Sequence, residues 1–387
     1  MRIKNATVLD GRLANGNAAG KFAPLDIEIE GDTIKALTAH ENAACGENDI
    51  DAKGLYVVPG MIDIHTHGAA GVDFVNNPEY EQARHYYASR GITSICATIR
   101  TMSIDKTVST IKNVIAETKK DSVGTHICGI HIEGPFIAKE KQGAMTATGI
   151  DCTVDNFIKL YEASEGLLRV MTIAPDRENA IDVIKAGAEH GVRMSLGHTS
   201  SDYDCALTAV DAGATGSTHT FNAMTAYNHR KPGILGVALT DERVICEMIS
   251  DFVHLHPATM RLIYQMKGAA HVAVISDCGA MTGMGDGEYI VDGRVRYVKD
   301  GVCLTADGTI AGSTKTMDFG AQNLLSLGIP MEEVAMMTSL TPARAIGMAD
   351  KFGSIAEGKR ADLIICDDKF NIKAVLVGGK IVPAYQK

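Results

Sequence analysis

The sequence predicts a (β/α)8 TIM barrel with a small β-sandwich domain formed by the N- and C-terminal segments, and three observations lead to this α/β fold class. Short apolar runs alternate with helix-like stretches through the middle of the chain, as in parallel β/α units. Five of these runs end at histidine or carboxylate side chains, and a barrel gathers its functional groups at its strand ends. Segments with the period-two pattern of strands stand at both ends of the chain.

The central region contains eight candidate strands, which is the strand count of a closed barrel. They cover residues 61–65, 92–98, 127–132, 169–173, 193–197, 214–218, 244–249 and 272–276. Helix-like segments lie between several of them, at 105–120, 154–164, 180–190 and 203–212. The pattern predicts further helices over 316–348.

The terminal segments predict strands at 3–9, 26–30 and 33–37, and again at 361–366, 372–377 and 380–382. Residues 14–23 are small and polar, so we expect a loop there. The simplest arrangement pairs the two ends of the chain. We therefore expect a β-sandwich domain from residues 1–57 plus 353–387 and a metal-dependent catalytic barrel from residues 58–352.

The charge and residue composition limit the classes of partner that the protein could bind. The net charge of -10 over 387 residues argues against nucleic acid, because phosphate backbones attract clustered Lys and Arg. A small anionic ligand needs only a local Arg or a helix N-terminus and stays open. The nine cysteines include no C-x-x-C pair, which indicates a reducing compartment. No apolar run approaches the ~20 residues that span a bilayer, so we expect a soluble, cytoplasmic protein with no membrane partner.

The side chains at the strand ends are metal-ligand types. His65 and His67 stand at alternate positions of one strand, so both point the same way and reach one ion. Glu133, His198 and Asp277 follow later apolar runs, and one further run ends at a histidine, His219. Imidazoles and carboxylates at a barrel's strand ends indicate a metal-dependent hydrolase.

Several motifs carry a resemblance to a known family. Residues 59–67, with their His pair, resemble the strand-one signature of the amidohydrolase superfamily. Six further motifs, in the same order along the chain, resemble the N-acetylglucosamine-6-phosphate deacetylase family: His131-Ile132-Glu133-Gly134-Pro135-Phe136, Leu196-Gly197-His198-Thr199, residues 218–224, residues 228–233, Ser276-Asp277 and residues 310–314.

The resemblance implies roles for individual residues. Glu133, His198 and His219 would bind the main divalent ion, expected to be zinc, although Fe, Co or Mn suits the same ligands. The intact His pair at 65 and 67 implies one or two ions per subunit, with Glu133 bridging. Asp277 would be the general acid/base. The residues implied to contact substrate or its phosphate are His254, which polarises the amide carbonyl, with Ala144, Asn222, Ala223, Arg230, Ile310, Ala311 and Gly312.

One position departs from the family pattern. Met145 stands where the family often has a histidine, so we do not expect the contact that the histidine side chain would make with the substrate. A backbone contact at Ala144 would remain. The resemblance also implies a homodimer, in which a partner subunit reaches the phosphate site.

The implied reaction is hydrolysis of N-acetylglucosamine 6-phosphate to glucosamine 6-phosphate and acetate, in amino-sugar catabolism and recycling. The galacto epimer is an alternative substrate, because no motif distinguishes the one hydroxyl group in which the two sugars differ. Another amidohydrolase acting on a small amide is also open. Dihydroorotases and hydantoinases are disfavoured, since they carry a metal-bridging Lys near strand four and residues 171–176 contain none. A non-catalytic protein on the same fold is disfavoured because Asp277 and the metal ligands are all present.

Overall fold

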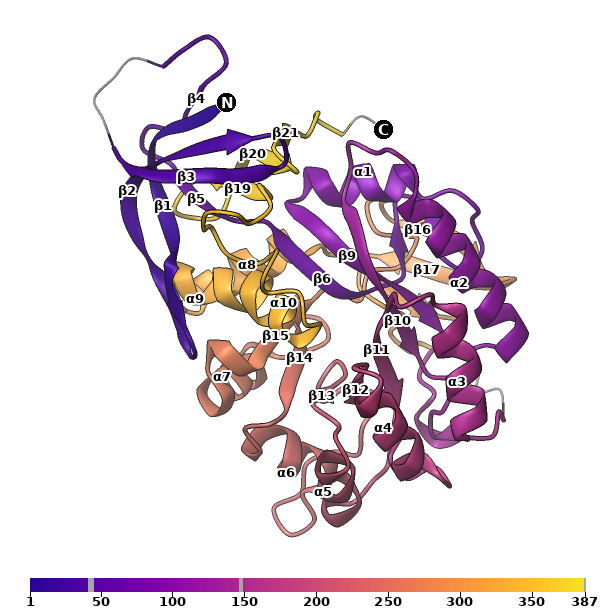
Figure 1. Ribbon diagram of the computed structural model, residues 1–387. Coiled ribbons are helices and arrows are strands. Elements are labelled where there is room, and N and C mark those ends of the chain that lie inside the picture. Colours follow the sequence, from indigo (N-terminus) through magenta and orange to yellow (C-terminus); the bar gives the residue numbers. More distant parts are fainter. Residues whose placement is uncertain (41–44, 146–148, 386–387) are drawn as a thin grey trace.

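The computed structural model describes residues 1–40, 45–145 and 149–385. Its centre is an eight-stranded parallel sheet curled into a barrel, with helices on the outside (Figure 1). The predicted fold class is confirmed. In sheet order the strands are β6 (Met61–Thr66), β9 (Ile92–Arg100), β10 (His126–Glu133), β11 (Leu168–Ile173), β12 (Arg193–Leu196), β13 (Gly216–Ser217), β14 (Ile245–Ile249) and β15 (Val272–Ile275).

The barrel strands form where the sequence has short apolar runs, because both faces of a parallel strand in a barrel are covered. Every residue of β6, β12 and β15 is buried. The ends of β15 and β6 meet at the last seam, where Asp277 N donates to the His65 carbonyl oxygen at 2.9 Å. The Asp63 carboxyl group crosses the same seam and accepts hydrogen bonds from Ser276. This seam places the first and last functional strand ends side by side.

Four of the outer helices occupy the predicted intervals at 105–120, 154–164, 180–190 and 203–212, with bounds that shift by one or two residues. Four of the outer helices begin at a side chain that accepts a backbone hydrogen bond, namely Ser103, Thr153, Asp202 and His256, so each has an N-cap. The helices around the barrel are α1 (Glu81–Ser89), α2 (Ile104–Thr118), α3 (Val154–Ala163), α4 (Ala180–Glu189), α5 (Tyr203–Asp211), α6 (Gly233–Thr240), α7 (Pro257–Lys267) and α8 (Met317–Ser326). After α8 the chain continues through α9 (Met331–Ala335), the π-helical turn η3 (Met336–Leu340) and α10 (Thr341–Ala345).

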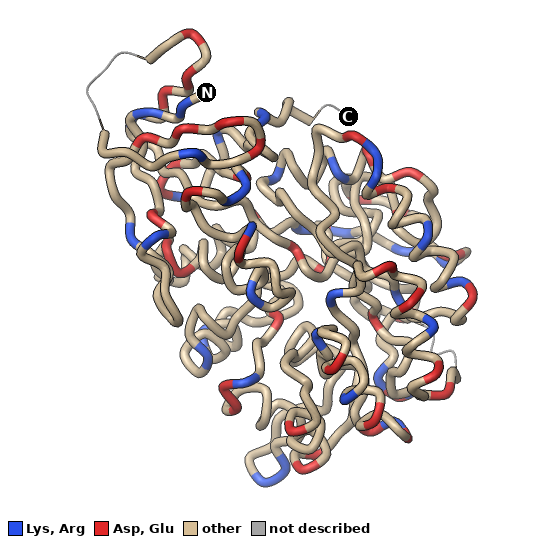
Figure 2. Tube along the Cα trace, in the orientation of Figure 1, with Lys and Arg blue, Asp and Glu red and all other residues tan. Residues whose placement is uncertain are grey.

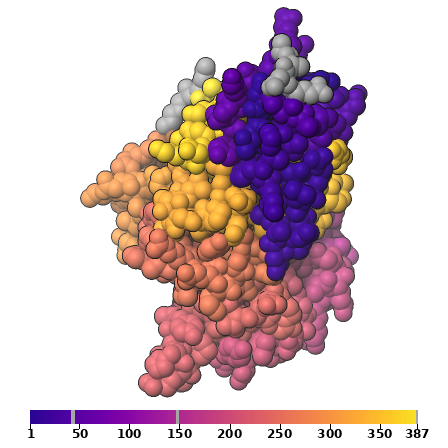
Figure 3. Space-filling model, turned by 90° about the vertical axis from the view of Figure 1, so that its left-hand side faces the viewer, coloured from indigo at the N-terminus to yellow at the C-terminus, as the bar shows by residue number. Residues whose placement is uncertain are grey.

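The terminal segments join in one separate sheet, and Figure 3 shows the first and last parts of the chain packed together. The order along it is β21 (Lys380–Ile381), β20 (Ile372–Val377), β19 (Leu363–Cys366), β5 (Tyr56–Pro59), β1 (Arg2–Asn15), β2 (Ala18–Glu30) and β3 (Thr33–Ala39), with β4 (Ile50–Asp51) paired to β1. The antiparallel contact between β19 and β5 connects the two ends of the chain.

The expectation of a loop at residues 14–23 is wrong. β1 and β2 form a long hairpin there, with Asn15 opposite Ala18 across the turn. Small residues give no period-two apolar pattern, yet their backbones pair as well as any others. Ala14, Ala19 and Phe22 pack against the barrel core, which stabilises the extended hairpin.

A third sheet was not anticipated from the sequence. β16 (Gly287–Val291), β17 (Arg294–Lys299) and β18 (Val302–Thr305) form a three-stranded antiparallel sheet after the last barrel strand. A two-stranded pair, β7 (Gly68–Ala69) and β8 (Val72–Asp73), follows the first barrel strand. Acidic and basic residues are interspersed along the chain, without a one-sign face in the view of Figure 2. Within the described residues, no helix combines the length and apolar character needed to cross a membrane.

Candidate metal centre

The barrel brings the predicted ligands to one end of its strands. Glu133 is the last residue of β10, whereas His198, His219 and Asp277 each lie two residues beyond a strand. These three have left-handed backbone conformations, with φ values of 49°, 28° and 51°. A positive φ is costly for a residue with a side chain and persists where the surrounding structure enforces it. The backbone therefore turns abruptly at each of these positions, which lets the side chain enter the site.

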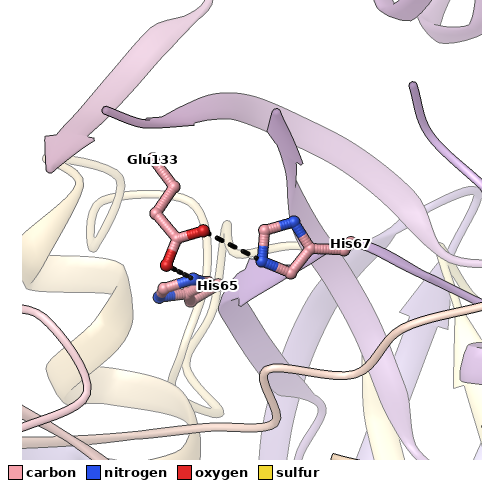
Figure 4. A group of neighbouring side chains, drawn as sticks. All are labelled: His65, His67 and Glu133. Atoms are coloured by element: carbon pink, nitrogen blue, oxygen red, sulfur yellow. Dashed lines mark ion pairs between the residues drawn. The ribbon is translucent and has the colours of Figure 1, made fainter. Parts of the chain in front are cut away.

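Glu133 is the centre of the cluster. Its Oε1 lies 3.1 Å from His198 Nε2, 3.2 Å from His219 Nε2 and 3.3 Å from His65 Nε2. Its Oε2 lies 3.4 Å from His67 Nε2. Figure 4 shows the carboxylate between the two strand-one imidazoles. One carboxylate thus joins two groups of ligand atoms, and each group has its atoms within 4.8 Å of one another.

The chemistry of these donors fits a divalent cation. His65 Nε2 faces the cluster and is buried without a hydrogen-bond partner among the described residues, and an unpaired buried nitrogen is costly. Burial opposes positive charge on His67, but hydrogen bonds to Asp277 and Glu133 and their charges raise its pKa to about 9. The cluster therefore attracts positive charge. Imidazole nitrogens and a carboxylate are ligands that zinc and related ions accept.

Asp277 lies beside the cluster. Its Oδ1 is 3.3 Å from His67 Nε2 and 3.7 Å from His65 Nε2. Burial disfavours the charged carboxylate, yet the hydrogen bond with His67 and the nearby imidazoles lower the pKa of Asp277 to about 2. The side chain is thus an ionised acceptor next to the ligands, as a general base requires.

The imidazoles are oriented by groups that sequence reasoning missed. Glu247, on β14, has Oε2 3.0 Å from His65 Nδ1 and accepts from the His219 backbone N–H at 3.2 Å. The Lys141 carbonyl oxygen lies 2.6 Å from His198 Nδ1. Such contacts fix which ring nitrogen carries the proton and which faces the ion. Glu247 left one trace in the sequence, since it is a lone acidic residue inside the apolar run 244–249.

His131, two residues before Glu133, belongs to the scaffold. Its Nε2 pairs with Thr172 Oγ1 at 2.8 Å and its Nδ1 with the Ile64 carbonyl oxygen at 3.1 Å. Both ring nitrogens are therefore occupied. Burial lowers the pKa of His131 to about 3, so the ring is neutral and ties β10 to its neighbours.

A cavity of about 940 Å³ opens onto the cluster. Two predicted site residues are not on its wall. His65 is fully buried beneath it, and Arg230 is exposed on the loop before α6. The remaining predicted residues all line the cavity: His67, Glu133, His198, His219, His254, Asp277, Ala144, Asn222, Ala223, Ile310, Ala311 and Gly312. Sequence reasoning missed the cationic residues on the same wall, which are Arg100, Lys106, Lys141, Arg294 and Arg296.

The fold and site define a barrel protein with a candidate metal centre at its strand ends. The sequence pattern of the amidohydrolase family matches residues 56–382. The chain belongs to this family, which is metal-dependent.

Two relatives within this family show which enzymes the chain is similar to. The N-acetylglucosamine-6-phosphate deacetylase of Vibrio furnissii is 32% identical, over 96% of this chain and 93% of the relative. The N-acetylgalactosamine-6-phosphate deacetylase of Escherichia coli O157:H7 is also 32% identical, over 84% of this chain and 86% of the relative.

Among solved structures, a mutant N-acetyl-D-glucosamine-6-phosphate deacetylase from Mycobacterium smegmatis, in complex with N-acetyl-D-glucosamine-6-phosphate, is 32% identical with a TM-score of 0.89. The match covers 99% of each chain. The resemblance to this deacetylase family, expected from the motifs, is confirmed.

Proposed function

We propose that this protein hydrolyses N-acetylglucosamine 6-phosphate to glucosamine 6-phosphate and acetate, in amino-sugar metabolism. The observation that carries the proposal is the ionised Asp277 beside the Glu133 cluster, at the base of a cavity that can hold a small molecule. The Mycobacterium smegmatis deacetylase that holds this sugar phosphate has the same fold over nearly its whole length.

The cofactor we propose is a divalent metal, zinc in the first place, with one or two ions per subunit. Glu133, His198 and His219 would hold the main ion, and His65 and His67 would hold a second ion with Glu133 between them. When bound, such an ion supplies a water acidic enough to ionise near neutral pH and polarises a carbonyl oxygen.

The protein's own groups account for the proton movements. Asp277 is ionised and at hydrogen-bond range of the cluster, so it accepts the proton of the attacking water and returns it to the leaving nitrogen. His254 lines the cavity, where it donates a hydrogen bond to the oxyanion that develops on the amide. Ala144, Asn222, Ala223 and the segment at 310–312 line the cavity where the sugar would lie.

The guanidinium groups on the wall suit the phosphate, because guanidinium groups bind phosphate oxygens through paired donors. Arg100 is already paired with Asp73 and Asp292, which limits its availability to the phosphate. Arg230 is exposed and outside the wall of this cavity. A phosphate contact by Arg230 would fit delivery from a second copy of the chain. We include a homodimer in the proposal for this reason.

We also propose a cytoplasmic location and a division into a β-sandwich domain at 1–57 plus 353–387 and a catalytic barrel at 58–352. All nine cysteines are free, which suits a reducing compartment. The mixed terminal sheet supports the division.

The test measures acetate release by zinc-loaded protein from the gluco and galacto 6-phosphates and from unphosphorylated N-acetylglucosamine. We expect release from the gluco phosphate, faster than from the galacto epimer, and little from the neutral sugar. Chelation should abolish release and zinc should restore it, which separates an enzyme from a non-catalytic binding protein. Faster acetate release from the galacto 6-phosphate would indicate that the galacto epimer is the substrate. No release from either phosphate by protein with bound metal would refute the deacetylase assignment.

A further inference from the structure

His254 forms a buried hydrogen-bonded pair with Asp251, and the proposed reaction gives Asp251 no role. Its Nδ1 lies 2.8 Å from Asp251 Oδ2, and both side chains are more than nine-tenths buried. The other carboxylate oxygen, Oδ1, accepts from the backbone N–H groups of Val253 and His254, both at 2.9 Å. Since Oδ1 is occupied by two fixed donors, the carboxylate cannot rotate away from the ring.

Ser313 connects this pair to the other catalytic group. Its hydroxyl donates to Asp251 Oδ2 at 2.9 Å, a shorter contact than its alternative with the Lys315 carbonyl oxygen at 3.3 Å. Its backbone N–H donates to the Asp277 carbonyl oxygen at 2.7 Å. One residue therefore bonds to the partner of His254 and to the backbone of Asp277.

We propose that Asp251 is a positioning residue that keeps His254 as an imidazolium, with Nδ1–H directed at the carboxylate and Nε2–H directed at the cavity. Ser313 holds this pair in a fixed position relative to Asp277. The inference rests on the proposed deacetylation, in which the amide oxygen is the acceptor for Nε2–H. A ring that gives one proton to Asp251 can donate a second only when both nitrogens are protonated. Among the described residues, His254 Nε2 has no hydrogen-bond partner, so it is available to substrate.

The charges around the ring support this state. Burial lowers the pKa of His254, but the hydrogen bond and charge of Asp251, with the charge of Asp277, outweigh it and raise the pKa. Burial also disfavours the Asp251 carboxylate, and the contact with His254 more than compensates, so its pKa is lowered. Lys315 directs its ammonium to the Phe319 ring, 5.4 Å from the ring centre. Among the side chains, Asp251 and Asp277 are the charged groups that act on His254.

The test observes the His254 protons directly. In zinc-loaded protein labelled with 15N-histidine, we expect both ring nitrogens of His254 to be protonated at pH 7, with the signals assigned by their loss in His254→Asn. In Asp251→Asn, the amide nitrogen faces Nδ1, so we expect a neutral ring with Nδ1 unprotonated. We expect kcat to fall on the order of 100-fold in this variant, near the cost of weakening one oxyanion donor, with little change in KM.

Matched controls separate positioning from general damage. Asp241→Asn breaks an ion pair with Arg243 away from the cavity and should leave both the His254 signals and kcat unchanged. Ser313→Ala should lower kcat roughly tenfold, the equivalent of one hydrogen bond, and Ser313→Thr should restore it. Ser164→Ala, at the end of α3, is the serine control.

Two results would overturn the proposal: a neutral His254 at pH 7 in the wild type, or an imidazolium and unchanged kcat in Asp251→Asn. The wild-type spectrum tests the protonation state of His254 even if Asp251→Asn fails to fold. These spectra need no substrate, so a wild type without deacetylase activity would refute the proposed function separately.

Discussion

His65 and Glu247 form a fully buried hydrogen bond across the barrel, with Nδ1 3.0 Å from Oε2. Because Nδ1 is directed at Glu247, Nε2 faces Glu133 and Asp277, 3.3 Å and 3.7 Å away, and is the ring atom left for a metal ion. Glu247 also accepts from the His219 backbone N–H. A single carboxylate on β14 therefore contacts a residue from each of the two groups of ligands.

We predict that Glu247→Met weakens binding of the second ion by about 10- to 100-fold, since an outer hydrogen bond of this kind contributes that much to metal affinity. Met keeps the length of the side chain and lacks the acceptor. Glu247→Gln keeps one acceptor oxygen and should lose less. The measurement is bound metal per subunit during titration of chelated protein. Equal binding by Glu247→Met and wild type would show that His65 needs no such support.

Gly312 is required beside Asp277. Its φ is +72°, and a Cβ there would lie 2.8 Å from the Asp277 carbonyl oxygen. We predict that Gly312→Ala shifts the Asp277 turn, lowers kcat and costs more than the roughly 1–2 kcal/mol of a left-handed non-glycine residue. Gly328→Ala is the matched control, because Gly328 has φ +81° and open space around the added carbon.

Chemical denaturation and steady-state kinetics of both variants test this prediction. Gly328→Ala should lose stability alone, whereas Gly312→Ala should lose stability and activity. If both variants keep wild-type kcat, the close contact with Asp277 has no catalytic consequence.

His126 makes the stability of the fold depend on pH. It lies at the start of β10, stacked on Phe352, and burial lowers its pKa to about 4. Between pH 4 and its ordinary pKa near 6.5, the unfolded chain binds more protons, so stability rises with pH. The neutral ring contributes fully above about pH 6.5 and its contribution is lost as pH falls toward 4.

We therefore predict that, between pH 7 and pH 4, wild type loses at most about 3 kcal/mol of unfolding free energy relative to His126→Leu. Urea denaturation of the metal-loaded proteins at several pH values measures it. A difference that stays constant over this range would mean that His126 titrates alike in the folded and unfolded chain.

The sequence predicted the barrel and the convergence of its ligands because both follow from local signals. A strand buried on both faces is an apolar run, and polar residues such as Glu133 and His219 interrupt that pattern at the strand ends. Parallel strands place these ends together, so order along the chain was enough to predict the cluster. Family motifs then supplied His254 and the sugar-lining positions.

The parts that sequence reasoning missed depend on contacts between distant segments. Glu247 faces His65 from 182 positions away, and Ser313 reaches Asp251 across 62. No local pattern records either pairing. β17 has Arg296 on its buried face and Lys299 on its exposed face, so its apolar pattern is weak. The hairpin at 14–23 is paired through small residues.

The decisive experiment compares acetate release and bound metal in wild type and Asp277→Asn. We predict that Asp277→Asn keeps the metal held by Glu133, His198 and His219 and loses nearly all release of acetate from N-acetylglucosamine 6-phosphate. Release at the wild-type rate by Asp277→Asn would contradict the assignment of Asp277 as the group that moves the proton.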